Sequence, residues 1–297
     1  MKAFAAFILR GPMQAATVVL AASMLPLLAV VGAGALALVT LRNGFLQGAV
    51  PALIAGSVLS LFHWLTLGTA QPALVTVLEL WLPVVLLAEL LRRSVSLPLT
   101  VVAWMGLGMV AVIGFHWMVP DPVAYWRQLL EPLAVHFGGG APLDAEARAF
   151  MEEALLPAMT GLWALSLMAM VLAGLFLGRW WQAVLFNPGG FRDEFHALHL
   201  GRGTAVVAAL VWLASVFTGP GLLYDLAGVL AAGFVLQALS MTHALVAARG
   251  WSVGWLVAVY LVMPLLFRPM ALVGIGDALF DWRGRLAGRS DDRGQDR

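Results

Sequence analysis

The sequence contains no cysteine and very little charge. Cysteine is absent from all 297 residues, and only 11% of the residues are charged. The missing thiols exclude disulfides, cysteine nucleophiles and cysteine-held iron–sulfur clusters. Soluble domains carry about a quarter charged residues, so this composition excludes an ordinary soluble globular protein. The formal net charge is only +1, which gives no electrostatic support for binding nucleic acid.

Long apolar runs make up most of the chain. Hydrophobic residues form 62% of the sequence, and the mean hydropathy is +0.92. A membrane-spanning helix needs about 20 apolar residues. The candidate runs are 12–41, 45–66, 72–91, 96–118, 157–178, 203–218, 222–248 and 251–282. The first and last are interrupted by prolines, Pro26 and Pro264 with Pro269, and each is predicted to form two short helices. We therefore expect an all-α, polytopic transmembrane helix bundle of eight to ten membrane segments, with short proline-broken segments at both ends.

The distribution of basic residues predicts the orientation of these segments. When both terminal runs are split, 14 of the 17 basic residues fall on one side. Basic loops stay in the cytoplasm, so both termini are predicted to be cytoplasmic. This topology makes 119–156 an external loop and 180–202 a cytoplasmic amphipathic loop. Residues 1–283 would form a single transmembrane domain, and 284–297 a charged, disordered cytoplasmic tail.

Small residues recur at four-residue spacing along several runs. The first stripe is Gly44, Gly48, Ala52, Gly56 and Ser60, and similar steps occur at Ala29, Ala33 and Ala37 and at Gly174 and Gly178. Such stripes allow helix backbones to approach closely within a membrane. They predict tight helix packing, with a docking face for another membrane subunit as the alternative.

Four ionisable residues are predicted at membrane depth near the outer side: Glu79, His63, His116 and Asp225. An ionisable group within a span costs about 2.5–3.5 kcal/mol or more, which makes each one a functional candidate. One interpretation is an outward-facing polar pocket, rimmed by Trp64, Trp81 and Tyr224, that binds a cationic or hydrogen-bonding solute. The other is that these groups are interfacial or paired within the bundle.

On the inner side, polar residues are predicted to act as structural anchors. Glu89 can pair with Arg93 one turn later, and Asp277 can face Arg283 or water near the inner surface. Gln237 and Ser240 share a helix face suited to interhelical hydrogen bonds.

The 180–202 loop contains a turn followed by a short amphipathic helix. Asn187-Pro188-Gly189-Gly190 is a turn sequence, and Phe191, Phe195 and Leu198 then form an apolar stripe opposite charged residues. The candidate partner-binding residues are Asn187, Gly189, Gly190, Phe191, Arg192, Glu194, Phe195 and His196. His196 and His199 lack the HExxH spacing of a zinc site, so neither a metal nor a cofactor is expected.

The loop also carries a family resemblance. Residues 187–196, together with 38–48 and 274–283, resemble the YybS-like family of predicted bacterial membrane proteins, whose function is unknown. This resemblance implies a location in the bacterial inner membrane. The N-terminal third is similar to the substrate-binding S components of energy-coupling-factor transporters, which bind a vitamin or metal from outside and dock on a transmembrane subunit.

Two functions are compatible with these patterns. The first is binding or transport of a small molecule at the outer polar residues, and the second is a membrane scaffold that recruits a cytoplasmic or membrane protein through the 180–202 loop. In both cases lipid is a partner. An enzyme is not expected, because the chain has no GxSxG, HExxH or Walker motif, and Ser240 and His243 lie on one predicted helix.

Overall fold

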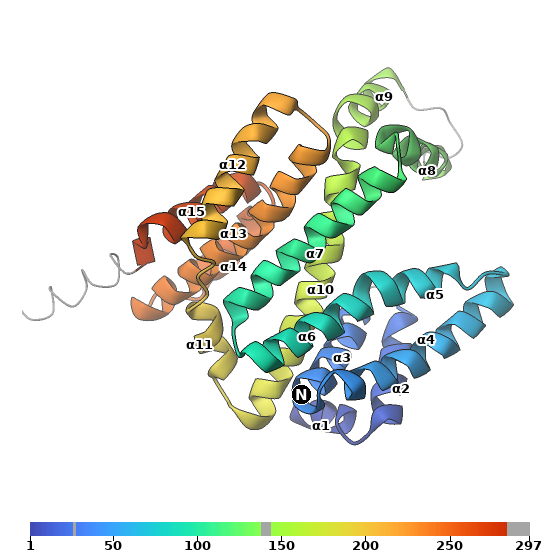
Figure 1. Ribbon diagram of the computed structural model, residues 1–297, viewed down its shortest axis with the longest axis vertical. Coiled ribbons are helices and arrows are strands. Elements are labelled where there is room, and N and C mark those ends of the chain that lie inside the picture. The colour runs from blue at the N-terminus through green and yellow to red at the C-terminus, as the bar shows by residue number, and fades with distance from the viewer. Residues whose placement is uncertain (26–27, 138–143, 284–297) are drawn as a thin grey trace, which may run out of the picture. The chain divides into compact units, whose positions relative to one another are not determined.

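A computed structural model describes residues 1–25, 28–137 and 144–283 (Figure 1). The described residues form helices and no strands, which confirms the all-α class. Five helices are long and apolar enough to cross a membrane, or up to seven if each of two bent pairs counts as one span. These helices have the length and composition of a multi-pass membrane protein. The count of eight to ten segments stays a prediction, and the predictions for Pro26 and the 284–297 tail lie outside the described residues.

The chain divides into two compact units. The first contains residues 1–104 and 167–199, and the second contains residues 105–166 and 200–297. Two of the three boundaries fall within helices, α7 (Leu97–Met118) and α10 (Leu156–Phe186), and the third lies between His199 and Leu200. The expectation of a single transmembrane domain remains a prediction.

The first unit is built around four packed helices. These are α2 (Pro12–Ser23), α3 (Ala29–Asn43), α4 (Phe45–Leu67) and α6 (Leu82–Ser94). The unit also contains α1 (Lys2–Ile8), α5 (Gln71–Thr76), a π-helical turn at Val77–Trp81, the C-terminal part of α10, and α11 (Gly190–His196). Helices α1 and α2 meet at a bend of 114°. The long first run, 12–41, forms two helices, α2 and α3, as its sequence predicts.

Small residues bring the helices of the first unit into close contact. A Cβ atom built at Gly178 would lie 2.5 Å from the Cβ of Ala37, and one at Gly174 would lie 2.6 Å from the Cβ of Ala33. These pairs show that α10 and α3 touch along their small-residue stripes. The predicted tight packing is confirmed at these positions.

The second unit is centred on α13 (Leu222–Ala248). Helices α12 (Arg202–Thr218) and α15 (Phe267–Phe280) pack against α13 and against each other (Figure 1). Helix α14 (Gly254–Val262) precedes α15 at a bend of 118°, so the last apolar run is also two helices. The remaining elements of this unit are parts of α7 and α10, α8 (Pro122–Phe137), α9 (Ala145–Phe150) and a π-helical turn at Met151–Leu155.

Two buried polar clusters confirm the predicted anchors. Glu89 accepts hydrogen bonds from Arg92 at 2.8 Å and from Arg93 at 2.5 Å. In the second unit, the Gln237 amide donates to Asp277 at 2.8 Å, which links α13 to α15. The Arg283 guanidinium also donates to Asp277, at 2.9 Å. These contacts satisfy carboxylates that would otherwise be buried without a partner.

The two segments predicted to be loops, 119–156 and 180–202, contain helices. Most described residues of 119–156 are helical, and Trp126 of α8 stacks on Phe115 with ring centroids 5.5 Å apart. The 180–202 loop begins later than predicted, because α10 continues to Phe186. Arg179 lies within this helix and pairs with Glu194. The chain turns instead at Gly189, whose φ of 93° suits glycine.

Candidate functional site

The candidate site lies in the second unit, where two helices begin. Gly219 and Gly221 have φ values of 68° and 144°, and this glycine-rich turn leads into the first turn of α13, which carries Tyr224 and Asp225. Helix α15 begins at Phe267, directly after the 118° bend, so Arg268 is its second residue. The glycine turn before α13 and the bend before α15 thus place Tyr224, Asp225 and Arg268 in the first turns of two apolar helices.

Asp225 is held by a histidine from another helix. The Nε2 atom of His116, near the end of α7, lies 2.8 Å from Oδ2 of Asp225. Asp225 is only 2% exposed, and its second oxygen, Oδ1, is buried and accepts no hydrogen bond. Oδ1 faces Gly161 of α10, where an added Cβ would lie 2.8 Å from it. The pair is therefore enclosed between three helices.

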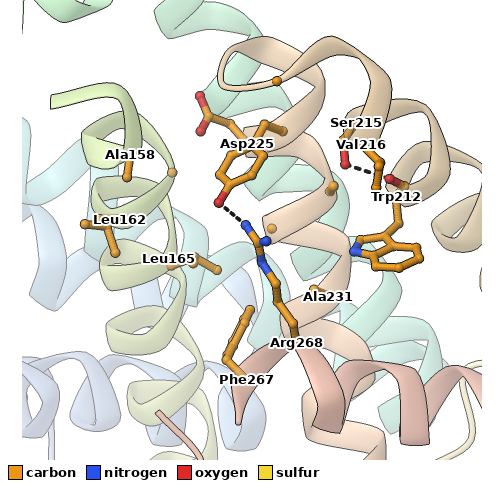
Figure 2. Close-up of a pocket in the computed structure, with 15 residues that line it drawn as sticks. Ala158, Leu162, Leu165, Trp212, Ser215, Val216, Asp225, Ala231, Phe267 and Arg268 are labelled. Carbon is orange, nitrogen blue, oxygen red and sulfur yellow. Dashed lines mark hydrogen bonds between the residues drawn. The ribbon is translucent and has the colours of Figure 1, made fainter. Parts of the chain in front are cut away.

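A cavity of about 410 Å³ lies beside this pair (Figure 2). Its walls come from α10, α12, α13 and the start of α15, and most of the side chains are apolar or small. They include Ala158, Leu162, Leu165, Val216, Ala231 and Phe267. The polar residues of the lining are Trp212, Ser215, Tyr224, Asp225 and Arg268. A cavity of this size, mostly apolar with a few polar groups, is typical of small-molecule sites.

Arg268 is the exposed charged residue of this lining. Figure 2 shows it between Leu165 on one side and Trp212 on the other. Its guanidinium donates a hydrogen bond to the hydroxyl of Tyr224 and lies 4.7 Å from the centre of the Tyr224 ring. Among the described residues, Arg268 forms no ion pair with a carboxylate. The cavity thus holds a positive charge that contacts the ring and hydroxyl of Tyr224 and pairs with no carboxylate in the described part of the chain.

The structure brings together two of the four predicted site residues. His116 and Asp225 form the pair described above, whereas His63 and Glu79 belong to the first unit. Glu79 lies in the π-helical turn Val77–Trp81, a feature often found at functional positions. The Nδ1 atom of His63 is buried without a hydrogen-bond partner. The predicted aromatic rim is wrong at Trp81, which is only 1% exposed and packs in the core.

The predicted partner-binding residues are placed largely by contacts within the first unit. Phe191 and Phe195 lie 5.2 and 5.9 Å from the ring of Phe176 on α10. Glu194 pairs with Arg179, and the Gly190 amide donates to the Asn187 carbonyl at 3.0 Å. Of the eight candidate residues, Arg192 is an exposed charged side chain, while His196 is half-buried.

A smaller cavity of about 230 Å³ lies next to this loop. Arg92, Arg179, Gln182 and Glu194 line it. These side chains already bind carboxylates or amides of the same unit: Arg92 pairs with Glu89, and Arg179 with Glu194 and Gln182. No group of three or more metal-ligating side chains occurs among the residues that the structure describes.

Of the residues that line the cavity, sequence reasoning singled out only Tyr224 and Asp225. Arg268 was not among the candidate residues, although an arginine within an apolar run is a signal for a membrane site. Gly161 and Gly228 carry no such signal, because their role depends on which helix they face. No family model, curated protein or solved structure matches this chain.

Proposed function

We propose that this chain binds a small molecule in the cavity of its second unit, as a membrane-bound binding or transport protein. The observation that carries the proposal is Arg268 on the wall of an apolar cavity of about 410 Å³, where it pairs with no carboxylate among the described residues. A charge placed among apolar side chains is costly unless a ligand or a polar partner compensates it. The enclosed His116–Asp225 pair supports the same wall from behind.

The proposal includes a location. The predicted topology, with both termini in the cytoplasm, would place the start of α13 and Arg268 near the outer side of a bacterial inner membrane. The cavity would then take its ligand from outside or from the outer leaflet. Membership of the YybS-like family and the similarity to S components are part of this proposal and rest on the sequence resemblance.

A cavity-filling variant tests the proposal. A Cβ added at Gly228 of α13 would contact only Leu165, at 4.0 Å, so Gly228→Leu should fill the cavity without displacing a helix. The purified protein, embedded in lipid nanodiscs, would be screened for thermal stabilisation by vitamins, amino acids, carboxylic acids and amphiphiles. We expect at least one compound to stabilise the wild-type protein and to lose its effect in Gly228→Leu.

The matched control is Gly106→Leu. Gly106 is a glycine of α7 outside the cavity lining, and a Cβ there would meet no atom within 4 Å. This variant should bind like the wild-type protein. Failure of every compound to stabilise the wild-type protein, or equal stabilisation of Gly228→Leu, would contradict binding in the cavity.

The scaffold alternative has weaker support. Its proposed aromatic contacts, Phe191 and Phe195, already pack on Phe176. A photo-crosslinker placed at the exposed Arg192 tests it, because a recruited partner should give one reproducible product in membranes. Absence of such a product would contradict the scaffold.

A further inference from the structure

We infer that the ligand of the second-unit cavity is an amphiphile with an anionic head group, a carboxylate or a phosphate, and a hydrocarbon tail. This inference rests on the proposed function and adds the chemical class of the ligand. Three features of the cavity lead to it: the sign of its accessible charge, the helix end beside that charge, and the exposed apolar side chains of its lining.

The accessible charge in the cavity is positive. Both carboxylate oxygens of Asp225 are unavailable, because Oδ2 is bound to His116 and Oδ1 is buried against Gly161. Arg268, in contrast, is exposed. A guanidinium carries five N–H donors in a fork that matches the oxygens of a carboxylate or a phosphate. Tyr224 accepts from one nitrogen of Arg268, Nη2, so donors remain for a ligand.

The helix end beside Arg268 has the same sign. Arg268 is the second residue of α15, and the N-terminus of a helix carries a partial positive charge. The first turn of α15 contains no acidic residue, and its N-cap residue, Leu266, makes no side-chain cap. Helix α13 differs, because Asp225 supplies an acid in its first turn. An arginine at an uncapped N-terminus therefore favours an anion from outside the chain.

Apolar side chains of the cavity lining are also exposed. Leu162 and Val216 line the cavity and are also 47% and 61% exposed on the surface of the unit. Apolar side chains exposed on a membrane helix contact lipid tails. The cavity therefore continues into a surface where a hydrocarbon tail can lie, while the head group reaches Arg268. A fully hydrophilic anion would leave these apolar walls without a matching partner.

Matched probes that share one tail test the inference. The full-length protein in phosphatidylcholine nanodiscs would be titrated with dodecyl phosphate, dodecanoate, dodecanol, dodecyltrimethylammonium and inorganic phosphate. We expect the two anionic amphiphiles to bind roughly tenfold to a hundredfold more tightly than dodecanol, which is the range for hydrogen bonds to a charged group. The cationic amphiphile and inorganic phosphate should bind more weakly than dodecyl phosphate.

Substitutions at Arg268 then assign the preference. Arg268→Gln should remove the advantage of the anionic probes and leave dodecanol binding unchanged, while Arg268→Lys should retain part of it. Arg249→Gln is the matched control, because Arg249 also lies over an aromatic ring, 5.1 Å from the centre of Trp251, but does not line the cavity. Unfolding temperatures measured without ligand show whether each variant is folded.

The outcomes separate this inference from the proposed function. Equal binding of dodecanol and dodecyl phosphate, with both lost in Gly228→Leu, would overturn the anionic class and leave binding in the cavity intact. Inorganic phosphate binding as tightly as dodecyl phosphate would overturn the amphiphile. If neither these probes nor the broader set of compounds binds the wild-type protein, the proposed function itself is contradicted.

Discussion

Oδ1 of Asp225 lies so close to Gly161 that a single methyl group at position 161 would stand 2.8 Å from it. The two residues belong to different helices, α13 and α10, and the same aspartate is bound to His116 through its other oxygen. The buried His116–Asp225 pair therefore requires glycine at position 161. The pair in turn fixes one wall of the cavity.

This contact predicts strong coupling between positions 161 and 225. Gly161→Ala alone should destabilise the protein, because a clash in a packed interior costs about 1–3 kcal/mol and exceeds the gain in helix propensity. In an Asp225→Ala background the clash is gone, and the same substitution should be neutral or stabilising. Unfolding free energies of the four proteins in a double-mutant cycle measure the coupling. Additive effects would show that a methyl group at position 161 does not touch the Asp225 carboxylate.

The small-residue contact between α3 and α10 gives a second prediction. A Cβ at Gly178 would lie 2.5 Å from the Cβ of Ala37 and 2.8 Å from the carbonyl oxygen of Gly34. Gly178→Ala should therefore separate the helices and lower the unfolding free energy by about 1–3 kcal/mol. Gly114→Ala is the control, because a Cβ there meets no atom within 4 Å and should be neutral or stabilising. Equal effects at both positions would contradict the close approach.

Much of this architecture follows from the sequence. Hydropathy predicted the long apolar helices, and Pro264 predicted the break between α14 and α15, because lipid requires long apolar segments with internally satisfied backbones. Four-residue spacing predicted the small-residue stripe that carries Gly178, because this spacing can be read from the sequence of a single helix. Ion pairs between residues one helical turn apart, such as Glu89 and Arg93, could also be predicted from the sequence.

The cavity of the second unit could not be predicted from the sequence in the same way. Periodicity shows which face of a helix carries small or polar residues. It does not show which other helix that face contacts. His116 and Asp225 were singled out as costly polar residues, but their contact spans 109 positions and needs the fold. The π-helical turn at Val77–Trp81 was also missed, because it differs from an α-helix by a small backbone adjustment with no distinct residue pattern.

The buried cluster around Asp277 gives a third prediction. Asp277 is 0% exposed and accepts from Gln237 and Arg283, and the Gln237 carbonyl in turn accepts from the Leu200 amide at 2.9 Å. Asp277→Ala should lower the unfolding free energy by about 3 kcal/mol, because it leaves buried polar groups without partners. Glu153→Ala, at an exposed acid, should change it by less than about 0.5 kcal/mol. Chemical unfolding in detergent measures both, and a similar small effect for Asp277→Ala would contradict the cluster.

The ion pair between Arg179 and Glu194 gives the last prediction. Glu194 lies on α11, a helix of 7 residues, which is too short to be stable without tertiary contacts. Glu194→Ala should therefore raise the hydrogen-exchange rate of the amides in 190–196 by about fivefold to tenfold, the equivalent of about 1–1.4 kcal/mol. Asp193→Ala is the matched control on the same helix, because Asp193 is exposed and its side chain makes no contact in the ion pair. If both variants exchange at the wild-type rate, the packing of Phe191 and Phe195 on Phe176 alone must hold α11, and the double variant Glu194→Ala with Phe195→Ala should then release it.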